Sequence, residues 1–557
     1  MSSFFPPTKA SSTATEVIIH PVTTRMVLVK TSTPPKRMTA PVVATIVVPP
    51  PTKKRRQTSA QGPNTGANKR LKPNASGRTT PRSLSGSSAS PPSTRAASRA
   101  SSRRASTTPA PLPTPSNDPI PRPCGIDQDG NITVKSAADV VRDLMSSYKS
   151  YFRDPEHPEH NAYGPDGRGG PPQVTLEMPN TGASEVFTLL QPKDPDHYNP
   201  IFDLRGVVHA IIDYFVPQTE RWKFGTPTDQ ITLPSDMNIF CHQSDPIPDP
   251  PIDTSVHQYP YGNITHGIAM SFNRCDGPAF VKHINNFNKL VRELKCDSNG
   301  ENLLMKEVKG WLGVSPKLVK AIVEQTYQRC VGPRIKDLRS YTAFSSNVYG
   351  ELMPNFISDI ILQTSVRPGS HVLDLGCGVG NVVLQAALQA GCTTAGIEVM
   401  KKPAALGKEQ LAHLRDRLRL WGVSMGDAEV IEGDFREHNL VHHLQRADVV
   451  VVNNYAFEPR LNDELSRLFL DLKEGAVVIS LKPFVPSNWR LKEFNAESPV
   501  AILRVEERDF LPGMVSWCVK GGTYYLNYID RSMLREFAEH GATTSTRSTR
   551  GTRRTSR

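Results

Sequence analysis

Apolar and polar positions alternate in blocks that predict strands and helices in turn across the second half of the chain. Short apolar runs are typical of buried strands, and the stretches between them carry apolar residues at the 3.6-residue spacing of a helix. Glycine or proline stands at many of the predicted ends. The predicted strands are residues 371–375, 394–399, 428–432, 447–452 and 476–481, and the predicted helices are 359–365 (the last turns of a helix), 381–390, 404–421 and 459–473.

Strands that alternate with helices in this way are typical of a parallel sheet with helices on both faces. Two later runs, AILRVEERDF and MVSWCVKGGTYYLNYI, predict antiparallel strands that finish the sheet. Before the sheet, apolar residues recur at helical spacing from Phe280 to Cys330, which predicts a mainly helical lobe. The expected fold class is therefore α/β, with a Rossmann-like sheet preceded by a helical lobe.

The region before this lobe has a mixed pattern. We expect a short helix in SAADVVRDLMSSYKSYF, a loop from Asp154 to Gln173, a strand in EVFTLL and a helix in LRGVVHAIIDYFV. Asp245–Pro251 is rich in proline and aspartate and is expected to be a linker. We place the start of the compact catalytic unit near Pro200.

The N-terminal segment, residues 1–123, differs in composition from the rest of the chain. It holds 19 Lys and Arg against 2 acids, and it is rich in Pro, Ser and Thr, so we predict that it is disordered. The whole chain carries a net charge of +12, so the remainder is slightly acidic. Two basic clusters, Lys53–Arg56 and Lys69–Lys72, predict nuclear import and contact with nucleic-acid phosphates. A solvated linker is the alternative. The C-terminal TRSTRGTRRTSR has the same chemistry.

Other classes of protein find little support in the sequence. The apolar run VVATIVV is too short to span a bilayer, and the N-terminus lacks a signal-peptide pattern, so we expect a soluble intracellular protein without a membrane partner. The 8 cysteines form no C-x-x-C pair and have no histidine partners at zinc spacing. We therefore expect reduced thiols and no metal.

A glycine-rich turn carries the first chemical signal. From Val372 to Val399 the sequence is VLDLGCGVGNVVLQAALQAGCTTAGIEV, a strand, turn, helix and second strand that ends at Glu398. Glycines in the turn let the backbone approach a ligand closely, and a carboxylate about 20 residues further on can accept hydrogen bonds from a ribose diol. The spacing is G-x-G-x-G, not that of a pyrophosphate site, and Asp374 would repel phosphate but suits a cation. The stretch predicts a site for S-adenosylmethionine, which carries a sulfonium and an ammonium.

Polar residues follow the next strands at the same edge of the sheet, where ligands of such folds bind. Asp434 is expected to accept a hydrogen bond from the exocyclic amine of adenine, and Phe435 is expected to pack on the adenine ring. Taken singly, Asp434 could be a helix cap, Phe435 a core residue and Glu398 a surface acid. Asn453 follows a four-valine strand and can hold a polar group, with an Asn-rich turn as the alternative. The Asn-Pro-Pro-Tyr sequence of adenine and amide methyltransferases is absent.

These motifs together resemble one family. DLGCGVGNVVLQAA, GDF, VVNNYAF, SLKPFVP, VSW and YYLNYIDR follow FSSNVYGEL in this order between Tyr341 and Phe537. The series is similar to the disruptor-of-telomeric-silencing family, the non-SET methyltransferases of lysine 79 in histone H3. The resemblance implies a nuclear histone-lysine N-methyltransferase, with family roles in telomeric silencing, chromatin regulation and the DNA-damage checkpoint.

The resemblance also implies roles for single residues. A loop closing over the cofactor would contain Tyr349, Gly350, Glu351 and Leu352. Cofactor contacts would come from Val372, Leu373, Asp374, Leu375, Gly376, Cys377, Gly378, Val379, Gly380, Asn381, Glu398, Asp434, Phe435 and Asn453. The catalytic residues would be Asn453, Phe457, Trp517 and Tyr524, the last three as walls of a lysine channel. Some members carry Ser, Gln and Phe where this chain has Cys377, Asn381 and Tyr455.

The chemistry follows from what a lysine needs in order to attack a methyl group. Only about one amine in 10³ is neutral at pH 7, and an aromatic channel beside a cation would lower the lysine pKa. No convincing general base stands near the channel, so we expect catalysis by orientation and desolvation, with Asn453 positioning groups. The expected partner is the nucleosome, through the histone H3 core and, by way of the basic tail, its DNA.

Two other functions remain as alternatives, a methyltransferase of nucleic acid or small molecules and a non-catalytic chromatin-binding protein. The predicted organisation is a disordered basic tail with a nuclear localisation signal (1–123), a mixed segment (124–199), a helical lobe (200–340), an S-adenosylmethionine-binding methyltransferase domain (341–541) and a second basic tail (542–557).

Overall fold

In the computed structural model of this chain, the predicted strands form one seven-stranded sheet in the order β10-β11-β9-β8-β5-β6-β7. The five strands β5 to β9 run parallel, and β11 pairs antiparallel with both β9 and β10. The predicted α/β fold is confirmed. The strands are β5 His371–Leu375, β6 Thr393–Glu398, β7 Ala428–Glu432, β8 Val449–Val452, β9 Val477–Ser480, β10 Leu503–Phe510 and β11 Gly522–Ile529.

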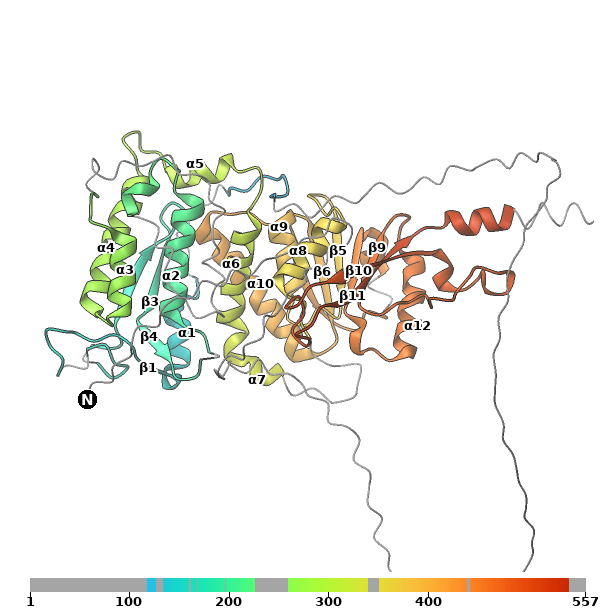
Figure 1. Cartoon of the computed structure of the whole chain (residues 1–557), viewed down its shortest axis with the longest axis horizontal. Coiled ribbons are helices and arrows are strands. Elements are labelled where there is room, and N and C mark those ends of the chain that lie inside the picture. Colours follow the sequence, from blue (N-terminus) through green and yellow to red (C-terminus); the bar gives the residue numbers. More distant parts are fainter. Residues whose placement is uncertain are drawn as a thin grey trace, which may run out of the picture. The chain divides into compact units, whose positions relative to one another are not determined.

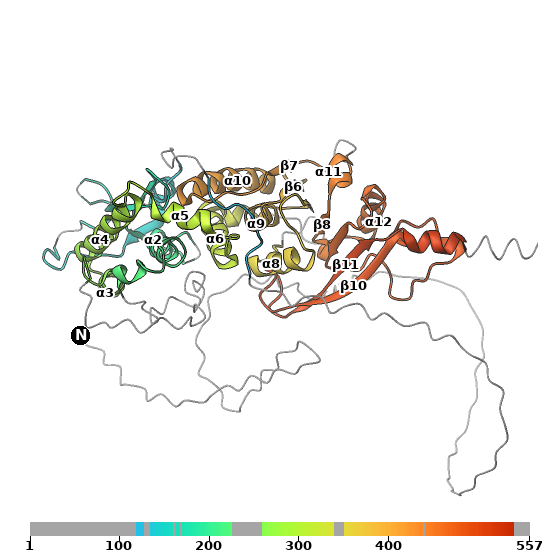
Figure 2. The same cartoon turned by 90° about the horizontal axis from the view of Figure 1, so that it is seen from above.

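Helices cover both faces of this sheet, because successive strand side chains point to opposite sides. In β8, Val449 and Val451 join one apolar cluster, and Val450 and Val452 join another. Figure 1 and Figure 2 show α8, α9 and α10 on one face and α11 and α12 on the other. These helices are α8 Pro354–Gln363, α9 Asn381–Ala390, α10 Lys401–Trp421, α11 Val441–Arg446 and α12 Pro459–Leu468. The sequence pattern did not predict α11.

The structure describes residues 118–126, 134–159, 162–167, 169–195, 197–225, 259–338, 350–437 and 441–539. All of them fall in one unit, Asn74–Arg557. Most of the predicted N-terminal tail, the expected linker Asp245–Pro251 and the predicted tail 542–557 lie outside the described residues.

The helical lobe before the sheet is confirmed. Its long helix α4 begins where the Asp276 side chain accepts a hydrogen bond from the backbone N–H of Ala279, and it buries Phe280, Ile284 and Phe287 along one face. The helices of the lobe are α3 Ile264–Asn273, α4 Gly277–Lys295, α5 Leu303–Gly310, α6 Pro316–Cys330 and α7 Ile335–Leu338.

The region before Pro200 belongs to the same apolar core, so the expected start of the compact unit near Pro200 is wrong. Tyr148 and Phe187 are buried in one cluster with Leu414 of α10. The expected helix in residues 136–152 ends at Asp143, because Tyr148–Ser150 pairs with a later strand. The expected strand EVFTLL is confirmed as far as Thr188, where β3 ends, and the helix expected in LRGVVHAIIDYFV is an α-helix to Ala210 and a π-helix over Ile211–Phe215. The elements are α1 Ala137–Asp143, β1 Tyr148–Ser150, β2 Gln173–Glu177, β3 Ser184–Thr188, β4 Leu190–Pro192 and α2 Pro200–Ala210.

Residues 118–126 form a strap between the lobe and the sheet. The backbone N–H of Arg122 donates to the Leu312 carbonyl at 2.7 Å, in the loop between α5 and α6. Its guanidinium donates to the carbonyls of Leu388 (2.6 Å) and Ser424 (2.7 Å) on the sheet side. Composition predicts that most of this segment belongs to the disordered tail. The residues that hold it come from distant parts of the chain, and composition does not reveal such partners.

A buried group of ion pairs also joins the lobe to the sheet. Glu185 of β3 pairs with Arg329 of α6 and with Arg417 of α10, each at 2.5 Å, and all three side chains are fully buried. Asp203 of α2 pairs with Arg329 at 2.5 Å. Burial alone would raise the pKa of Glu185, but the two arginines outweigh it and lower that pKa to about 2.

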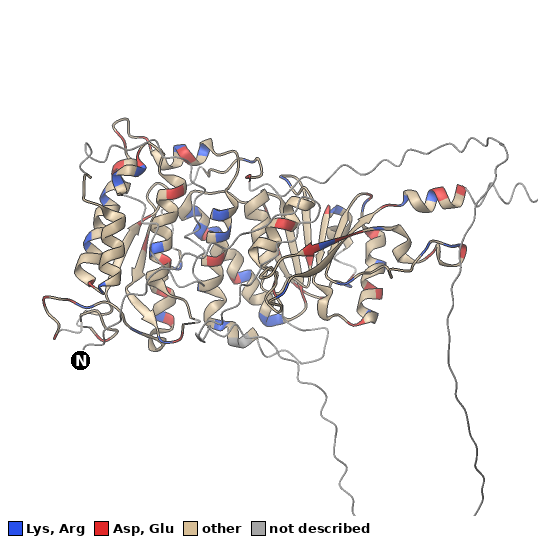
Figure 3. Cartoon of the chain, viewed as in Figure 1, with Lys and Arg blue, Asp and Glu red and all other residues tan. Residues whose placement is uncertain are grey.

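The last two strands depart from one prediction. The run MVSWCV is not a strand of the sheet, and only Val515 makes an isolated bridge, to Leu352. Along β10, Figure 3 shows basic and acidic positions together, which are Arg504, Glu506, Glu507, Arg508 and Asp509. Charges on an edge strand disfavour pairing with another chain.

Candidate active site

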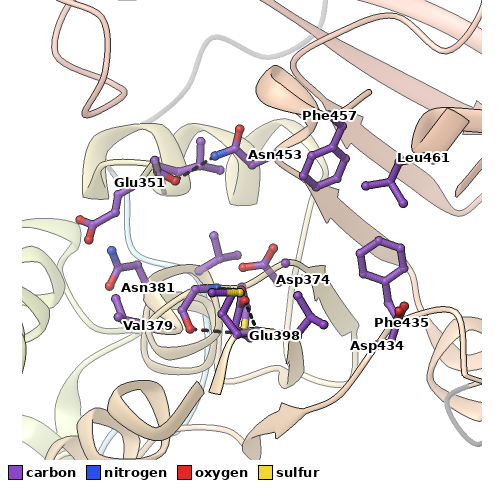
Figure 4. Close-up of a pocket in the computed structure, with 18 of the residues that line it drawn as sticks. Glu351, Asp374, Val379, Asn381, Glu398, Asp434, Phe435, Asn453, Phe457 and Leu461 are labelled. Carbon is purple, nitrogen blue, oxygen red and sulfur yellow. Dashed lines mark hydrogen bonds between the residues drawn. The ribbon is translucent and has the colours of Figure 1, made fainter. Parts of the chain in front are cut away.

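A cavity of about 230 Å³ opens where β5, β6, β7 and β8 end. The strand order reverses between β5 and β8, and ligands of such sheets bind at that reversal. Figure 4 shows Phe435, Phe457 and Leu461 at one end of this cavity and Glu351 and Asn381 at the other. The lining residues are Gly350, Glu351, Leu352, Asp374, Gly376, Cys377, Gly378, Val379, Asn381, Val382, Glu398, Val399, Met400, Asp434, Phe435, Arg436, Asn453, Phe457 and Leu461.

The glycine-rich turn forms one wall of the cavity. Gly376, Gly378 and Gly380 have φ values of 87°, 56° and 86°, a region that L side chains adopt only with strain. The turn leads directly into α9, and Gly376 and Gly378 line the cavity with their backbone. A ligand can therefore approach the main chain closely, as the sequence predicted.

Two carboxyl groups lie side by side in the cavity and differ in their partners. Glu398 accepts hydrogen bonds from the backbone N–H groups of Gly378 (2.9 Å) and Met400 (2.7 Å). Asp374 lies between Glu398 and Asn453 in Figure 4, and no described residue donates a hydrogen bond to its carboxyl group or pairs with it. Burial, with Glu398 adding to it, raises the pKa of Asp374 to about 8. Burial also raises the pKa of Glu398.

At one end of the cavity, the apolar side chains of Phe435 and of Leu461 in α12 lie with the carboxylate of Asp434 beside them. The Asp434 carboxylate is bound by the Arg436 side chain, whose Nε lies 2.8 Å from Oδ1, and these hydrogen bonds lower the pKa of Asp434. Nη1 of Arg436 also donates to Glu464 at 2.9 Å, which connects this end of the cavity to α12.

The other end is closed by the segment that begins at Gly350. Asn453 donates its side-chain N–H to the Gly350 carbonyl at 2.9 Å. Glu351 accepts a hydrogen bond from the Tyr327 hydroxyl at 2.8 Å, and its backbone N–H donates to Ser516 at 2.9 Å. The loop is thus held by the lobe, by β8 and by the segment before β11.

Two aromatic rings, Trp517 and Tyr455, are not among the residues that line the cavity but pack next to one of them, Gly350. A Cβ on Gly350 would lie 2.6 Å from the Trp517 ring, so only glycine allows this packing. Trp517 and Tyr455 have ring centroids 5.5 Å apart, and Tyr455 is 53% exposed. The pair offers an apolar surface next to Gly350, which lines the cavity.

Tyr524 occupies a different place. Its side chain is 1% exposed, its hydroxyl donates to Asp359 at 3.0 Å, and its ring packs against Phe356 of α8. It does not line the cavity, because its side chain faces α8. Its role as a channel wall stays a prediction.

Apart from Trp517 and Tyr524, which do not line the cavity, the predicted site residues divide into three groups. Fourteen of them line the cavity: Gly350, Glu351, Leu352, Asp374, Gly376, Cys377, Gly378, Val379, Asn381, Glu398, Asp434, Phe435, Asn453 and Phe457. Val372, Leu373 and Leu375 pack inside the sheet, and Gly380 packs against Leu384 and Val430. Tyr349 lies outside the described residues.

Sequence reasoning missed five lining residues, namely Val382, Val399, Met400, Arg436 and Leu461. Four of them lie one or two residues after a predicted site residue, so a wider window at each strand end would have found them. Leu461 lies on α12, and only its packing brings it to the cavity.

The charge of the lining residues indicates what the cavity can hold. Four acids, Glu351, Asp374, Glu398 and Asp434, face one arginine, Arg436. A buried carboxyl without a partner and a wall of exposed backbone suit a cationic nucleoside such as S-adenosylmethionine. Among the described lining residues there is no histidine, lysine or tyrosine to act as a general base.

Comparisons with known proteins give one family. Residues 327–529 match the family model described as Histone methylation protein DOT1. The chain is 32% identical over 526 residues to the H3 lysine-79 specific histone-lysine N-methyltransferase of Mycosarcoma maydis, covering 73% of this chain and 64% of that protein. It is 33% identical over 374 residues to the protein of the same description from Aspergillus fumigatus, covering 67% of each.

A third relative of that description, from Yarrowia lipolytica, is 35% identical over 358 residues, which cover 64% of this chain and 66% of that protein. The chain thus spans about two thirds of the length of these relatives. Within the described ranges, no helix is long and apolar enough to cross a membrane, and no three His, Cys, Asp or Glu side chains are grouped so that they could hold a metal ion.

Proposed function

This chain belongs to the DOT1 family of histone methylation proteins, and we propose that it transfers methyl groups from S-adenosylmethionine to lysine 79 of histone H3 in nucleosomes. The observation that carries the proposal is the acidic cavity at the strand reversal, with the unpartnered carboxyl of Asp374 inside it. A cationic methyl donor supplies the positively charged partner that the described residues do not give this carboxyl.

Each end of the cavity has a role in holding the donor. Glu398 accepts hydrogen bonds from the ribose hydroxyls, and its backbone bonds keep its carboxylate in place. Phe435 packs on the adenine ring, and Asp434 accepts from the adenine amine. Asp374 faces the positively charged end. When bound, S-adenosylmethionine supplies an electrophilic methyl group on its sulfonium.

The residues beside the donor prepare the lysine. Phe457, Trp517 and Tyr455 exclude water at the cavity rim, and this desolvation lowers the pKa of an incoming ammonium. Asn453 is fixed by its bond to the Gly350 carbonyl and orients groups rather than removing a proton. Catalysis then rests on orientation and desolvation. The proton of the lysine leaves to solvent before attack.

The partner is the nucleosome, since lysine 79 belongs to the histone core. The basic segment 1–123 adds attraction to DNA phosphates, and its Lys and Arg clusters also direct the protein to the nucleus. Deletion of residues 1–117 should weaken nucleosome binding and flatten its salt dependence. An unchanged salt slope would remove this role from the segment.

The decisive experiment uses labelled S-adenosylmethionine with the full chain and three substrates: nucleosomes, free histones and naked DNA. Label in histone H3 from nucleosomes, located at lysine 79 by mass spectrometry, supports the proposal. Label in DNA instead would make the protein a nucleic-acid methyltransferase. Gly376→Arg should fill the cavity and abolish transfer while nucleosome binding persists, which controls for loss of the fold.

A further inference from the structure

The acid at the adenine end of the cavity is held by an arginine that follows it by two residues. Nε of Arg436 lies 2.8 Å from Oδ1 and 3.0 Å from Oδ2 of Asp434, and Nη2 also donates to Oδ2. The same side chain reaches α12, where Nη1 donates to Glu464. Arg436 itself lines the cavity.

We propose that Arg436 is a positioning residue that fixes the Asp434 carboxylate and so makes the site selective for a base with an exocyclic amine. The inference rests on the proposed function, because it assumes that the base of the methyl donor lies at this end of the cavity. It adds a residue whose role neither the motif nor the position of the acid predicts.

A count of acceptor sites shows how the selection works. A carboxylate has about four lone-pair sites, two on each oxygen. Oδ1 of Asp434 accepts from the Arg436 backbone N–H at 2.9 Å, Oδ2 accepts from Nη2, and the single Nε hydrogen is shared between the two oxygens. Three N–H groups therefore occupy three of the four sites, and one site of the carboxylate stays open. A 6-amino group can donate to that site, whereas a 6-oxo group would bring a second oxygen against the carboxylate.

The link to α12 gives the arginine a second effect on the same end of the cavity. Leu461 of α12 lies near Phe435 in Figure 4, and the two apolar side chains border the space for a flat base. Glu464, one turn further along α12, is held by both Arg436 and Arg460. Arg436 therefore ties the strand end that carries Phe435 to the helix that carries Leu461.

The opposite hypothesis is that Arg436 competes with the base for Asp434. Removal of a competitor would tighten binding, and removal of a positioning residue would weaken it. The acceptor site left open on the Asp434 carboxylate favours positioning, since the amine does not have to displace the guanidinium.

Calorimetry with the full chain separates these possibilities. The ligands are S-adenosylhomocysteine and its analogue with hydrogen in place of the 6-amino group. Arg436→Met should weaken binding of S-adenosylhomocysteine about tenfold, the size of one charge-assisted hydrogen bond, and weaken binding of the analogue clearly less. Arg436→Lys should restore part of the loss. Arg460→Met is the matched control, because Arg460 also bonds Glu464 but not Asp434, and it should change neither affinity.

Three outcomes would overturn the inference: unchanged binding of S-adenosylhomocysteine by Arg436→Met, tighter binding, or an equal loss for both ligands. The last would mean a general structural role, which thermal unfolding of the variant would also report. Binding by the wild-type chain tests the proposed function separately. If the wild-type chain binds S-adenosylhomocysteine and the variant is unaffected, only the inference fails.

Discussion

Two groups of buried carboxyls in this chain have opposite surroundings. At the junction of lobe and sheet, Glu185 and Asp203 are paired with Arg329 and Arg417. In the cavity, Asp374 has no such partner and lies beside a second acid. The pKa of Glu185 is lowered to about 2, and that of Asp374 is raised to about 8.

The difference shows how burial can serve either structure or binding. Burial alone raises the pKa of a carboxyl, and only close cations reverse that effect. At the junction the cations come from α6 and α10, so the charges are neutralised within the fold. In the cavity none of the described residues supplies a cation to Asp374, so a ligand with positive charge lowers the pKa of this carboxyl and pairs with its ionised form.

The largest effect is expected from breaking the junction. Glu185→Gln leaves Arg329 and Arg417 facing a neutral amide in a fully buried place and should lower the free energy of unfolding by about 3–5 kcal/mol. Urea denaturation followed by tryptophan fluorescence measures it. Glu506→Gln is the control: this partly exposed acid of β10 pairs with Arg504 and Arg508, and its loss should cost less than about 1 kcal/mol. Equal effects in the two variants would contradict the structural role of the junction.

A smaller and different effect is expected in the cavity. Asp374→Asn removes a buried acid that has no ion-pair partner, so the free energy of unfolding should stay the same or rise. Affinity for S-adenosylmethionine, measured by calorimetry, should fall about 10- to 100-fold with the loss of one charged contact. 5′-Methylthioadenosine has the same base and ribose but no charge, and its affinity should not change. A variant that loses stability but keeps its affinity for S-adenosylmethionine would reverse the comparison.

Much of the fold could be predicted because its signals are local. The strands β5 and β7 and the helix α9 have the bounds that apolar runs and glycine positions predicted. The segment 118–126 could not be assigned, since its order depends on distant carbonyls such as those of Leu388 and Ser424. Likewise, nothing in the residues near Glu185 indicates that α10 will bring Arg417 to it.

The site was predictable where strand ends carry it. Asp374, Glu398 and Asn453 follow apolar runs directly, and parallel strands bring their carboxyl ends together. Arg436 directly follows the predicted Phe435 and was missed because it acts through Asp434, and Leu461 was missed because it lies on a helix away from every strand end. Family resemblance gives Tyr524 a place in the channel wall; its side chain packs against Phe356 of α8, and the role in the channel stays a prediction.

The most direct test of the acidic cavity is the number of protons released when S-adenosylmethionine binds. The pKa of Asp374 in the free chain is raised to about 8, so this carboxyl is mostly protonated at pH 7, and a bound cation favours its ionised form. Affinity should therefore rise with pH up to about 8 and then level off as far as Asp374 is concerned. Two other titratable groups, Glu398 and the Cys377 thiol, face the Asp374 carboxyl. Both are present in the wild-type chain and in Asp374→Asn, so a difference in proton release between the two proteins comes from Asp374.

Calorimetry at pH 7 in buffers of different ionisation enthalpy gives this number. The wild-type chain should release close to one proton, and Asp374→Asn markedly less, because in the variant only a proton from the ligand amine is still counted. Equal proton release by the two proteins, or no binding heat from the wild-type chain, would contradict this prediction.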